Sequence, residues 1–256
     1  MASEHSYPLA ILLFITFIFS CGPAFSEPNT LKVAVPPFAP FAFFKENSQC
    51  QGASVEILNR VAQHSHLTFQ HVRYPYARIL TSLKNGEVDI ALIFKNASVK
   101  GYVDYIGPVS KSRVVVLTPL NNPIKQYQDL HKLKAIAVIR KAQFENTFDI
   151  DQKINKVSVE SYLRALQMFE VERVDGVVGS FSGLEYSMKQ LKMDPKLLDN
   201  AFILGHKEWW LHISNKSPIL KSKDNIKSKI KNAVTALYEP RLSYQIYRKQ
   251  IQKCDI

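Results

Sequence analysis

The polar side chains best suited to chemistry in this 256-residue chain each follow an apolar run that is typical of a strand. They are Lys95, Asn96, Ser98, Arg140, Gln143 and Ser180. Open α/β sheets bind their ligands beyond the carboxyl ends of the strands. Amide, hydroxyl and cationic groups at those ends can hydrogen-bond and neutralise a small solute. We therefore predict a site for a small polar or anionic molecule, with a solvated exterior as the alternative for the last three residues.

Aromatic residues in the first half of the chain form a second set of candidates. They are Phe38, Phe43, Tyr76 and Phe94, with Arg78 two residues beyond Tyr76. Aromatic rings can form a wall against an apolar or cationic part of a ligand. The alternatives are ordinary packing under the loop for the phenylalanines and, for Arg78, a surface arginine lying over an aromatic ring.

Catalysis would require a poised acid or base. Glu145, His206 and Glu208 are the nearest candidates, and they form no recognisable constellation. The sequence has no Gly-x-Ser-x-Gly elbow, no His-Glu-x-x-His and no Walker loop, and its cysteines lack metal-ligand spacing. We therefore expect a binding protein without cofactor or metal rather than an enzyme.

A phrase that the chain uses twice predicts the elements that position these side chains. Leu80–Phe94 and Leu166–Phe181 each have the pattern of a helix end, a polar turn, Val-Asp and a buried apolar strand. A helix that feeds such a strand is typical of a parallel α/β sheet covered on both faces. Two copies predict two similar α/β lobes rather than one long sheet, with a small-molecule site in the cleft between them. Asp89 and Asp175, the two Val-Asp aspartates, are expected to cap turns or hold backbone amides.

The order of the predicted elements divides the chain into three parts. Residues 27–117 and 206–256 are expected to form a discontinuous first lobe, with residues 118–205 inserted as the second lobe. Short extended segments are predicted to take the chain between the lobes and back, at 105–109, 114–118, 201–204 and 209–213.

Residues 1–26 have the features of an export signal. Leu9–Phe19 is an almost unbroken apolar run that is too short to span a bilayer, and Ala24-Phe25-Ser26 offers small residues for cleavage. The segment before the run lacks Lys and Arg, which departs from the usual pattern. We predict a periplasmic protein exported by this signal peptide, with lipid anchoring at Cys21 as the alternative.

The two cysteines beyond the signal, Cys50 and Cys254, form an even pair. Even pairs in an oxidising compartment are commonly bridged, so we predict a disulfide that pins the C-terminal tail to the first lobe. Two unrelated thiols are the alternative.

The net charge of +11 would suit nucleic acid, an anionic membrane or an anionic ligand. The lysines concentrate in places such as Lys216–Lys231, where they alternate with the apolar stripe of a surface helix. The sequence has no aromatic-interleaved RNA-binding motif and no zinc-finger spacing. A solvated basic face is therefore expected, with no nucleic-acid partner.

Seven phrases occur along the chain in an order shared with a known family. They are VPPFAPFAFF, GASVEILNRVA, YPYARILTSLKNGEVDIAL, YIGPVS, LKAIAVIRKAQFENT, VSVESYLRALQMFEVERVDGVV and HISNKSPI. In this order the chain resembles the bacterial extracellular solute-binding proteins of family 3, the periplasmic receptors of polar amino acid transporters. The resemblance implies an α/β, type II periplasmic-binding-protein fold, in which two α/β lobes joined by a two-strand hinge close on a ligand.

The resemblance also implies a role and its partners. Such a receptor is expected to be a monomer that captures an amino acid-like metabolite between its lobes and delivers it to an ABC permease. One alternative is a ligand-sensing receptor that acts on a membrane sensor instead of a transporter. Another is a secreted enzyme similar to the cyclic-acid dehydratases of this fold.

Several positions depart from the family's amino acid-binding pattern. Gly101 stands where an arginine usually grips the ligand's α-carboxylate, and the neighbouring Lys100 lacks the planar donor fork of an arginine. Lys141-Ala142-Gln143 replaces a glycine and a small hydroxyl residue, and Ser180 replaces the acidic residue that pairs with the α-ammonium group. These changes argue against a standard α-amino acid as the ligand.

Overall fold

The computed structural model describes residues 30–43, 51–220 and 224–254, apart from the side chain of Cys254. The predicted export signal at 1–26, Cys21 within it, and the predicted bridge between Cys50 and Cys254 lie outside the described residues. None of the helices formed by the described residues has the length and apolar character that a membrane crossing requires.

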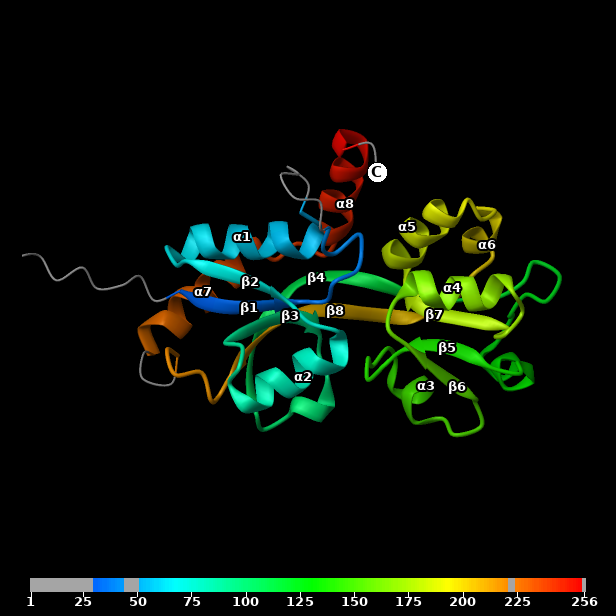
Figure 1. Cartoon of the computed structure of the whole chain (residues 1–256), viewed down its shortest axis with the longest axis horizontal. Helices are drawn as coiled ribbons and strands as arrows, with labels where there is room; N and C mark the ends of the chain where they lie inside the picture. The colour runs from blue at the N-terminus through cyan, green and yellow to red at the C-terminus, as the bar shows by residue number, and fades with distance from the viewer. Residues whose placement is uncertain (1–29, 44–50, 221–223, 255–256) are drawn as a thin grey trace, which may run out of the picture.

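The first lobe is built on three parallel strands, with β1 between β2 and β3. β3 is buried along its whole length, as its unbroken apolar sequence predicts. α1 and α2 cover opposite faces of these strands (Figure 1). α2 ends at Gly86, whose φ of 77° lies in the left-handed region that favours glycine. The elements of this lobe are β1 (Leu31–Val35), α1 (Ala53–Ser65), β2 (Phe69–Arg73), α2 (Tyr76–Asn85) and β3 (Ile90–Phe94).

The second lobe repeats this arrangement, with β5 between the parallel strands β6 and β7. α4 and α5 lie on one face of these strands and α3 lies on the other (Figure 1). A short η1 helix (Ala97–Val99) follows β3 in the first lobe. The elements of the second lobe are η2 (Tyr127–Lys132), β5 (Ile136–Ile139), α3 (Asn146–Ile150), β6 (Lys156–Val159), α4 (Tyr162–Glu170), β7 (Gly176–Ser180), α5 (Phe181–Leu191) and α6 (Lys196–Asp199).

The repeated Val-Asp phrase has the same structural role in both lobes. Asp89 accepts a hydrogen bond from the backbone N of Lys32 at 2.8 Å, and Asp175 accepts one from the backbone N of Lys134 at 2.5 Å. Each aspartate thereby fixes the chain near the start of the neighbouring strand, β1 or β5. The structural role predicted for both aspartates is confirmed.

Two long strands, β4 (Val103–Leu117) and β8 (Phe202–Ser214), run antiparallel to each other through both lobes. The sequence predicts four short segments here, whereas the structure joins them into two strands. Register shifts absorb the irregular stretch around Gly107 and Pro108, so the pairing continues past it.

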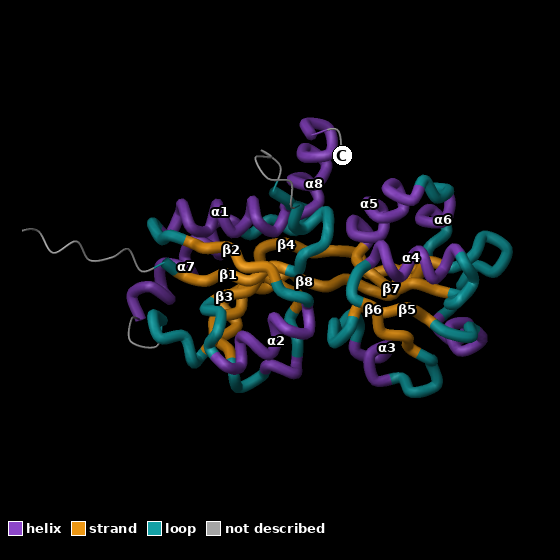
Figure 2. Tube along the Cα trace, viewed as in Figure 1, coloured by secondary structure: helices purple, strands orange, loops and turns teal. Residues whose placement is uncertain are grey.

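The hydrogen-bonded ladder is continuous, in the order β2-β1-β3-β8-β4-β7-β5-β6. The prediction that the two lobes do not share one long sheet is therefore wrong, because the two crossing strands belong to both lobes. β3 pairs with the Trp209–Ile213 half of β8, while β7 pairs with the Val114–Leu117 half of β4. The two-lobed α/β architecture with a two-strand hinge is confirmed, since each lobe keeps its own parallel strands and helices (Figure 2).

The chain returns after β8 with two helices, α7 (Asp224–Leu237) and α8 (Leu242–Cys254). Both helices pack against α1 and β4. α8 also reaches the second lobe, where Arg248 lies 3.5 Å from Glu185 of α5 and the ring of Tyr247 meets that of Tyr186 edge-on. The last helix thus contacts both lobes beside the hinge.

Candidate functional site

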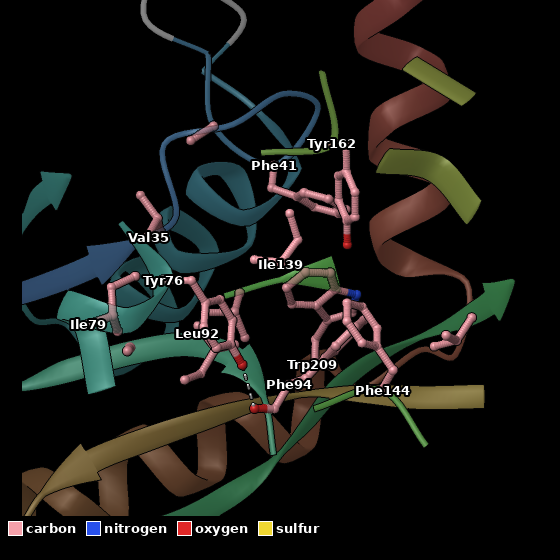
Figure 3. Packing of buried hydrophobic residues seen from close by; sticks show 14 of the residues in the cluster. Val35, Phe41, Tyr76, Ile79, Leu92, Phe94, Ile139, Phe144, Tyr162 and Trp209 are labelled. Atoms are coloured by element: carbon pink, nitrogen blue, oxygen red, sulfur yellow. Dashed lines mark hydrogen bonds between the residues drawn. The ribbon is translucent and has the colours of Figure 1, made fainter. Parts of the chain in front are cut away.

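An aromatic cluster fills the seam between the lobes (Figure 3). Phe94, at the end of β3, packs on the indole of Trp209 with ring centroids 4.3 Å apart, and Phe41 packs on the same indole at 4.6 Å. Trp209 Nε1 donates to Ser112 Oγ at 2.8 Å. Tyr76 is buried, its hydroxyl donates to the Phe94 carbonyl oxygen at 3.5 Å, and burial raises its pKa. These predicted ligand residues therefore pack against one another rather than line an open cavity.

Tyr162, the first residue of α4, brings the second lobe into this cluster. Its ring meets Phe38 edge-on, with centroids 5.3 Å apart. The ring lies between Gly179 and Gly183, where an added Cβ atom would overlap it. Its hydroxyl oxygen accepts hydrogen bonds from the backbone N of Ser180 at 3.2 Å and from Ser180 Oγ at 3.3 Å. Ser180 is fully buried, so its polar groups are engaged by Tyr162 instead of facing a solute.

Gly179→Ala is expected to lower the free energy of unfolding by about 1–3 kcal/mol, because the new methyl group forces the Tyr162 ring out of its niche. In a Tyr162→Ala background the same change should cost clearly less, since the overlap with the ring is gone and only the 3.1 Å contact with Leu184 Cγ remains. Urea denaturation of the four proteins in this double-mutant cycle measures the difference. Gly205→Ala is the matched control, because its Cβ would meet only the flexible Glu145 side chain, at 3.4 Å. Equal costs of Gly179→Ala in both backgrounds would contradict this placement of the ring.

Direct hydrogen bonds join the lobes on the polar side of the seam. Asn96 is buried, and its Nδ2 donates to the carbonyl oxygen of Lys141 at 2.9 Å. Gln143 Oε1 accepts from the backbone N of Ala97 at 2.6 Å. The loops after β3 and β5 therefore meet, as their positions at strand ends predict. Asn96, Ser98, Lys141 and Gln143 line a pocket of about 250 Å³ here, which we call the side pocket.

A larger cavity of about 800 Å³, which we call the groove, adjoins the side pocket and shares Gln143 and Asp149 with it. The first lobe, α3 of the second lobe and both crossing strands line the groove. Its lining includes four lysines: Lys95, Lys100, Lys111 and Lys207. The groove is therefore a place where a solute would contact both lobes at once.

The groove carries more positive than negative charge, since Asp149 and Glu208 are its two carboxylates. Glu208 Oε1 already lies 3.5 Å from Lys111 Nζ. Desolvation lowers the pKa of the half-buried Lys207 and raises that of Asp149, while each of the two charges favours ionisation of the other. An anion bound beside Lys207 would favour the protonated, charged form of this lysine.

Lys95 is held over two aromatic rings at the edge of the groove. Its Nζ lies 4.3 Å from the ring centroid of Trp210 and 4.8 Å from that of Tyr105. Cation–π attraction orients the ammonium group without neutralising its charge. Lys95 therefore remains available to an anionic ligand.

Besides the residues packed in the seam, three further predicted site residues line neither the groove nor the side pocket. Arg78 forms an ion pair with Glu87 at 2.9 Å, and Arg140 forms one with Glu160 at 2.9 Å, both between exposed side chains. Phe43 packs on a tyrosine ring of α5 with centroids 5.4 Å apart. Within the described parts of the chain, no group of three or more His, Cys, Asp or Glu side chains is placed to hold a metal ion.

Tyr105 and Trp210 of the groove and Tyr162 of the seam are not among the site residues predicted from the sequence. For Trp210 a signal was present, because His206, Glu208 and Trp210 alternate along a strand and so share one face. Tyr162 had no local signal, since the glycines of its niche lie on β7 and α5.

Two α/β lobes that share a pair of crossing strands and enclose a groove are the architecture of hinged solute-binding proteins. The family model of the bacterial extracellular solute-binding proteins, family 3, matches residues 31–253. The chain therefore belongs to this family, and the expectation from its ordered phrases is confirmed.

Individual relatives are distant. A probable histidine-binding protein of Neisseria gonorrhoeae is 24% identical over 123 residues, which cover 47% of this chain and 46% of that protein, so the match spans about half of its length. The VFT2 domain of BvgS from Bordetella pertussis, solved as a double mutant, superposes with a TM-score of 0.65 at 20% identity, covering 87% of this chain and 93% of that one. The substrate-binding protein of an amino acid ABC transporter superposes with a TM-score of 0.63 at 16% identity, covering 88% and 98%. These structural likenesses establish the fold.

Proposed function

We propose that this protein is an exported receptor that captures a small anionic metabolite in the groove between its lobes. The groove carries the proposal, because both lobes and both crossing strands line it and four of its lining side chains are lysines. A solute that contacts both lobes binds most tightly when the lobes hold this arrangement, so binding shifts the equilibrium between lobe positions. The family's role supports the proposed periplasmic location and delivery to an ABC permease.

The proposed ligand is an anion rather than a standard α-amino acid. Gly101, at the position expected for the arginine, has a left-handed φ of 85°, and an added Cβ there would meet open space. Ser180, at the position expected for the acidic residue, is buried beneath the Tyr162 hydroxyl. Neither half of an α-amino acid clamp is present at these two positions, whereas the groove lysines offer charge to a carboxylate or phosphate.

Replacing Lys95 and Lys207 together with glutamine is expected to weaken binding of the preferred anion about tenfold or more, since a charge-assisted hydrogen bond contributes roughly 1.5–3 kcal/mol. A thermal-shift screen of amino acids, organic acids and polyamines identifies the solute first, because a ligand of the native state raises Tm. Calorimetry then compares the double variant with the wild type. Lys229→Gln with Lys231→Gln on α7 is the matched control, because it removes the same charge away from the groove.

Two results would contradict the proposal. If the Lys95/Lys207 variant binds the identified solute as tightly as the wild type does, the solute binds outside the groove. If no polar metabolite raises Tm, the uptake role fails.

We propose binding without turnover. Glu145, one of the three acid–base candidates, accepts from the backbone N of Phe148 at 3.0 Å as the cap of α3. Glu208 accepts from Trp210 Nε1 at 3.0 Å. These contacts favour structural roles for both carboxylates over proton transfer. The solute identified by thermal shift should be recovered unchanged after incubation, and a product would instead support a dehydratase-like enzyme.

A sensing receptor is the second candidate. The observation that favours it is the seam, where the protein's own side chains already join the lobes through Asn96, Gln143 and Tyr162. A solute could then change an existing lobe contact instead of creating one. Co-purification with a permease would support transport, whereas co-purification with a membrane kinase or cyclase would support sensing.

A further inference from the structure

A third cavity lies beside the hinge, between α5 and the start of α8, with a volume of about 460 Å³. We call it the hinge cavity. β4 contributes Lys111, Ser112 and Arg113, and β8 contributes His206. Phe181 and Ser182 belong to the first turn of α5, and the segment Pro240–Tyr244 closes the other side. The hinge cavity therefore lies between the second lobe and the C-terminal helix that packs on the first lobe.

Among the residues that the structure describes, three cationic side chains and no carboxylate line the hinge cavity. The Arg113 guanidinium lies over the Phe181 ring, with its Cζ 4.0 Å from the centroid, so a cation–π contact fixes its position without neutralising its charge. Arg241 adds a second guanidinium from the opposite wall. Lys111 is shared with the groove and lies 3.5 Å from Glu208.

The chemistry of this lining matches a multivalent oxyanion. A guanidinium presents a planar fork of N–H donors that fits a carboxylate or phosphate bidentately. Ser182, a buried residue with a hydroxyl group, lines the same cavity as the two arginines. Phe181 and Tyr244 supply an apolar wall, and the volume lies in the range of metabolite sites.

From this arrangement we propose that the hinge cavity is a second binding site, distinct from the groove, for a small molecule that carries two or more carboxylate or phosphate charges. Such a ligand binds Arg113 from β4 and Arg241 from the start of α8. Because the walls come from both lobes, its binding stabilises the lobe arrangement described above and raises Tm. Ligands at the two sites would then affect each other's affinity reciprocally.

Calorimetry with citrate and with inorganic phosphate tests the proposal, and monovalent acetate serves as the control ligand. Arg113→Gln with Arg241→Gln is expected to weaken binding of the preferred probe at least tenfold. Lys229→Gln with Lys231→Gln removes the same charge from α7 and should leave the affinity unchanged. A better response to citrate indicates a polycarboxylate, and a better response to phosphate indicates a phosphorylated metabolite.

Nuclear magnetic resonance of the wild-type protein provides a readout that does not depend on the variants folding. The preferred probe should shift the backbone amide resonances of Ser182 and Arg241. Shifts confined to the groove, at Lys95 and Lys207, would overturn the hinge site while leaving the proposed function intact. Equal affinity in the arginine variant, or no binding of either probe at millimolar concentration, would also overturn it.

Discussion

Trp209→Ala should lower the free energy of unfolding by about 3–5 kcal/mol, because a large buried ring is lost and the cavity it leaves is only partly refilled. Trp209 is 4% exposed and lies on β8, where its indole contacts both Phe41 and Phe94. The variant also leaves Ser112 Oγ without its indole donor. Chemical denaturation followed by circular dichroism measures the loss.

Trp210→Ala is the matched control on the neighbouring position. The Trp210 ring is only half-buried at the edge of the groove, where it contacts Lys95. Its removal should therefore cost clearly less stability than removal of Trp209, while it should weaken binding of the groove ligand. Equal stability losses in the two variants would contradict the deeper burial of Trp209 in the seam.

Protonation of His212 by itself is expected to lower the free energy of unfolding by up to about 3 kcal/mol as the pH is lowered from 6.5 to 4. Desolvation of this fully buried ring is the largest cause that lowers its pKa from 6.5 to about 4, and the nearby Lys95 charge adds to it. A hydrogen bond to the Trp210 carbonyl oxygen opposes the shift. The folded state therefore favours the neutral ring. The stability that depends on neutral His212 is fully present above pH 6.5 and is lost as the pH falls to the pKa of the folded state.

Denaturation curves of the wild type and of His212→Asn across this range isolate the contribution. The asparagine amide can still donate to the Trp210 carbonyl oxygen but does not titrate, so the pH dependence should become shallower. His64→Gln is the control variant, because it replaces an exposed imidazole instead of a buried one. His71, whose pKa is also lowered by burial, accounts for part of the dependence that remains. An unchanged slope in His212→Asn would contradict the assignment.

The sequence predicted part of the lining of the proposed binding site. The strand-end rule placed Lys95, Asn96, Ser98 and Gln143 together, and the structure brings all four to the groove or the side pocket. The same rule failed for Arg140, whose long side chain turns to the exterior to pair with Glu160. A strand-end position fixes where a Cα lies, but a flexible side chain follows its nearest opposite charge.

By itself, the sequence determined the two-lobed fold and the roles of its recurring residues. The two Val-Asp phrases specify a helix, a turn and a buried strand in each lobe, and both aspartates hold a neighbouring strand as the repeat predicts. Local periodicity and turn residues suffice for this, because each unit is built from neighbours in the chain.

Only the tertiary structure decided which side chains fill the seam and which line the open groove. Tyr162 occupies a niche formed by Gly179 and Gly183, and its hydroxyl engages the buried Ser180. The groove takes its lysines from β4, β8 and the loop after β3, which meet through pairing between distant strands. Side-chain volume and long-range strand pairing settle these contacts, and neither is encoded in the local pattern of the chain.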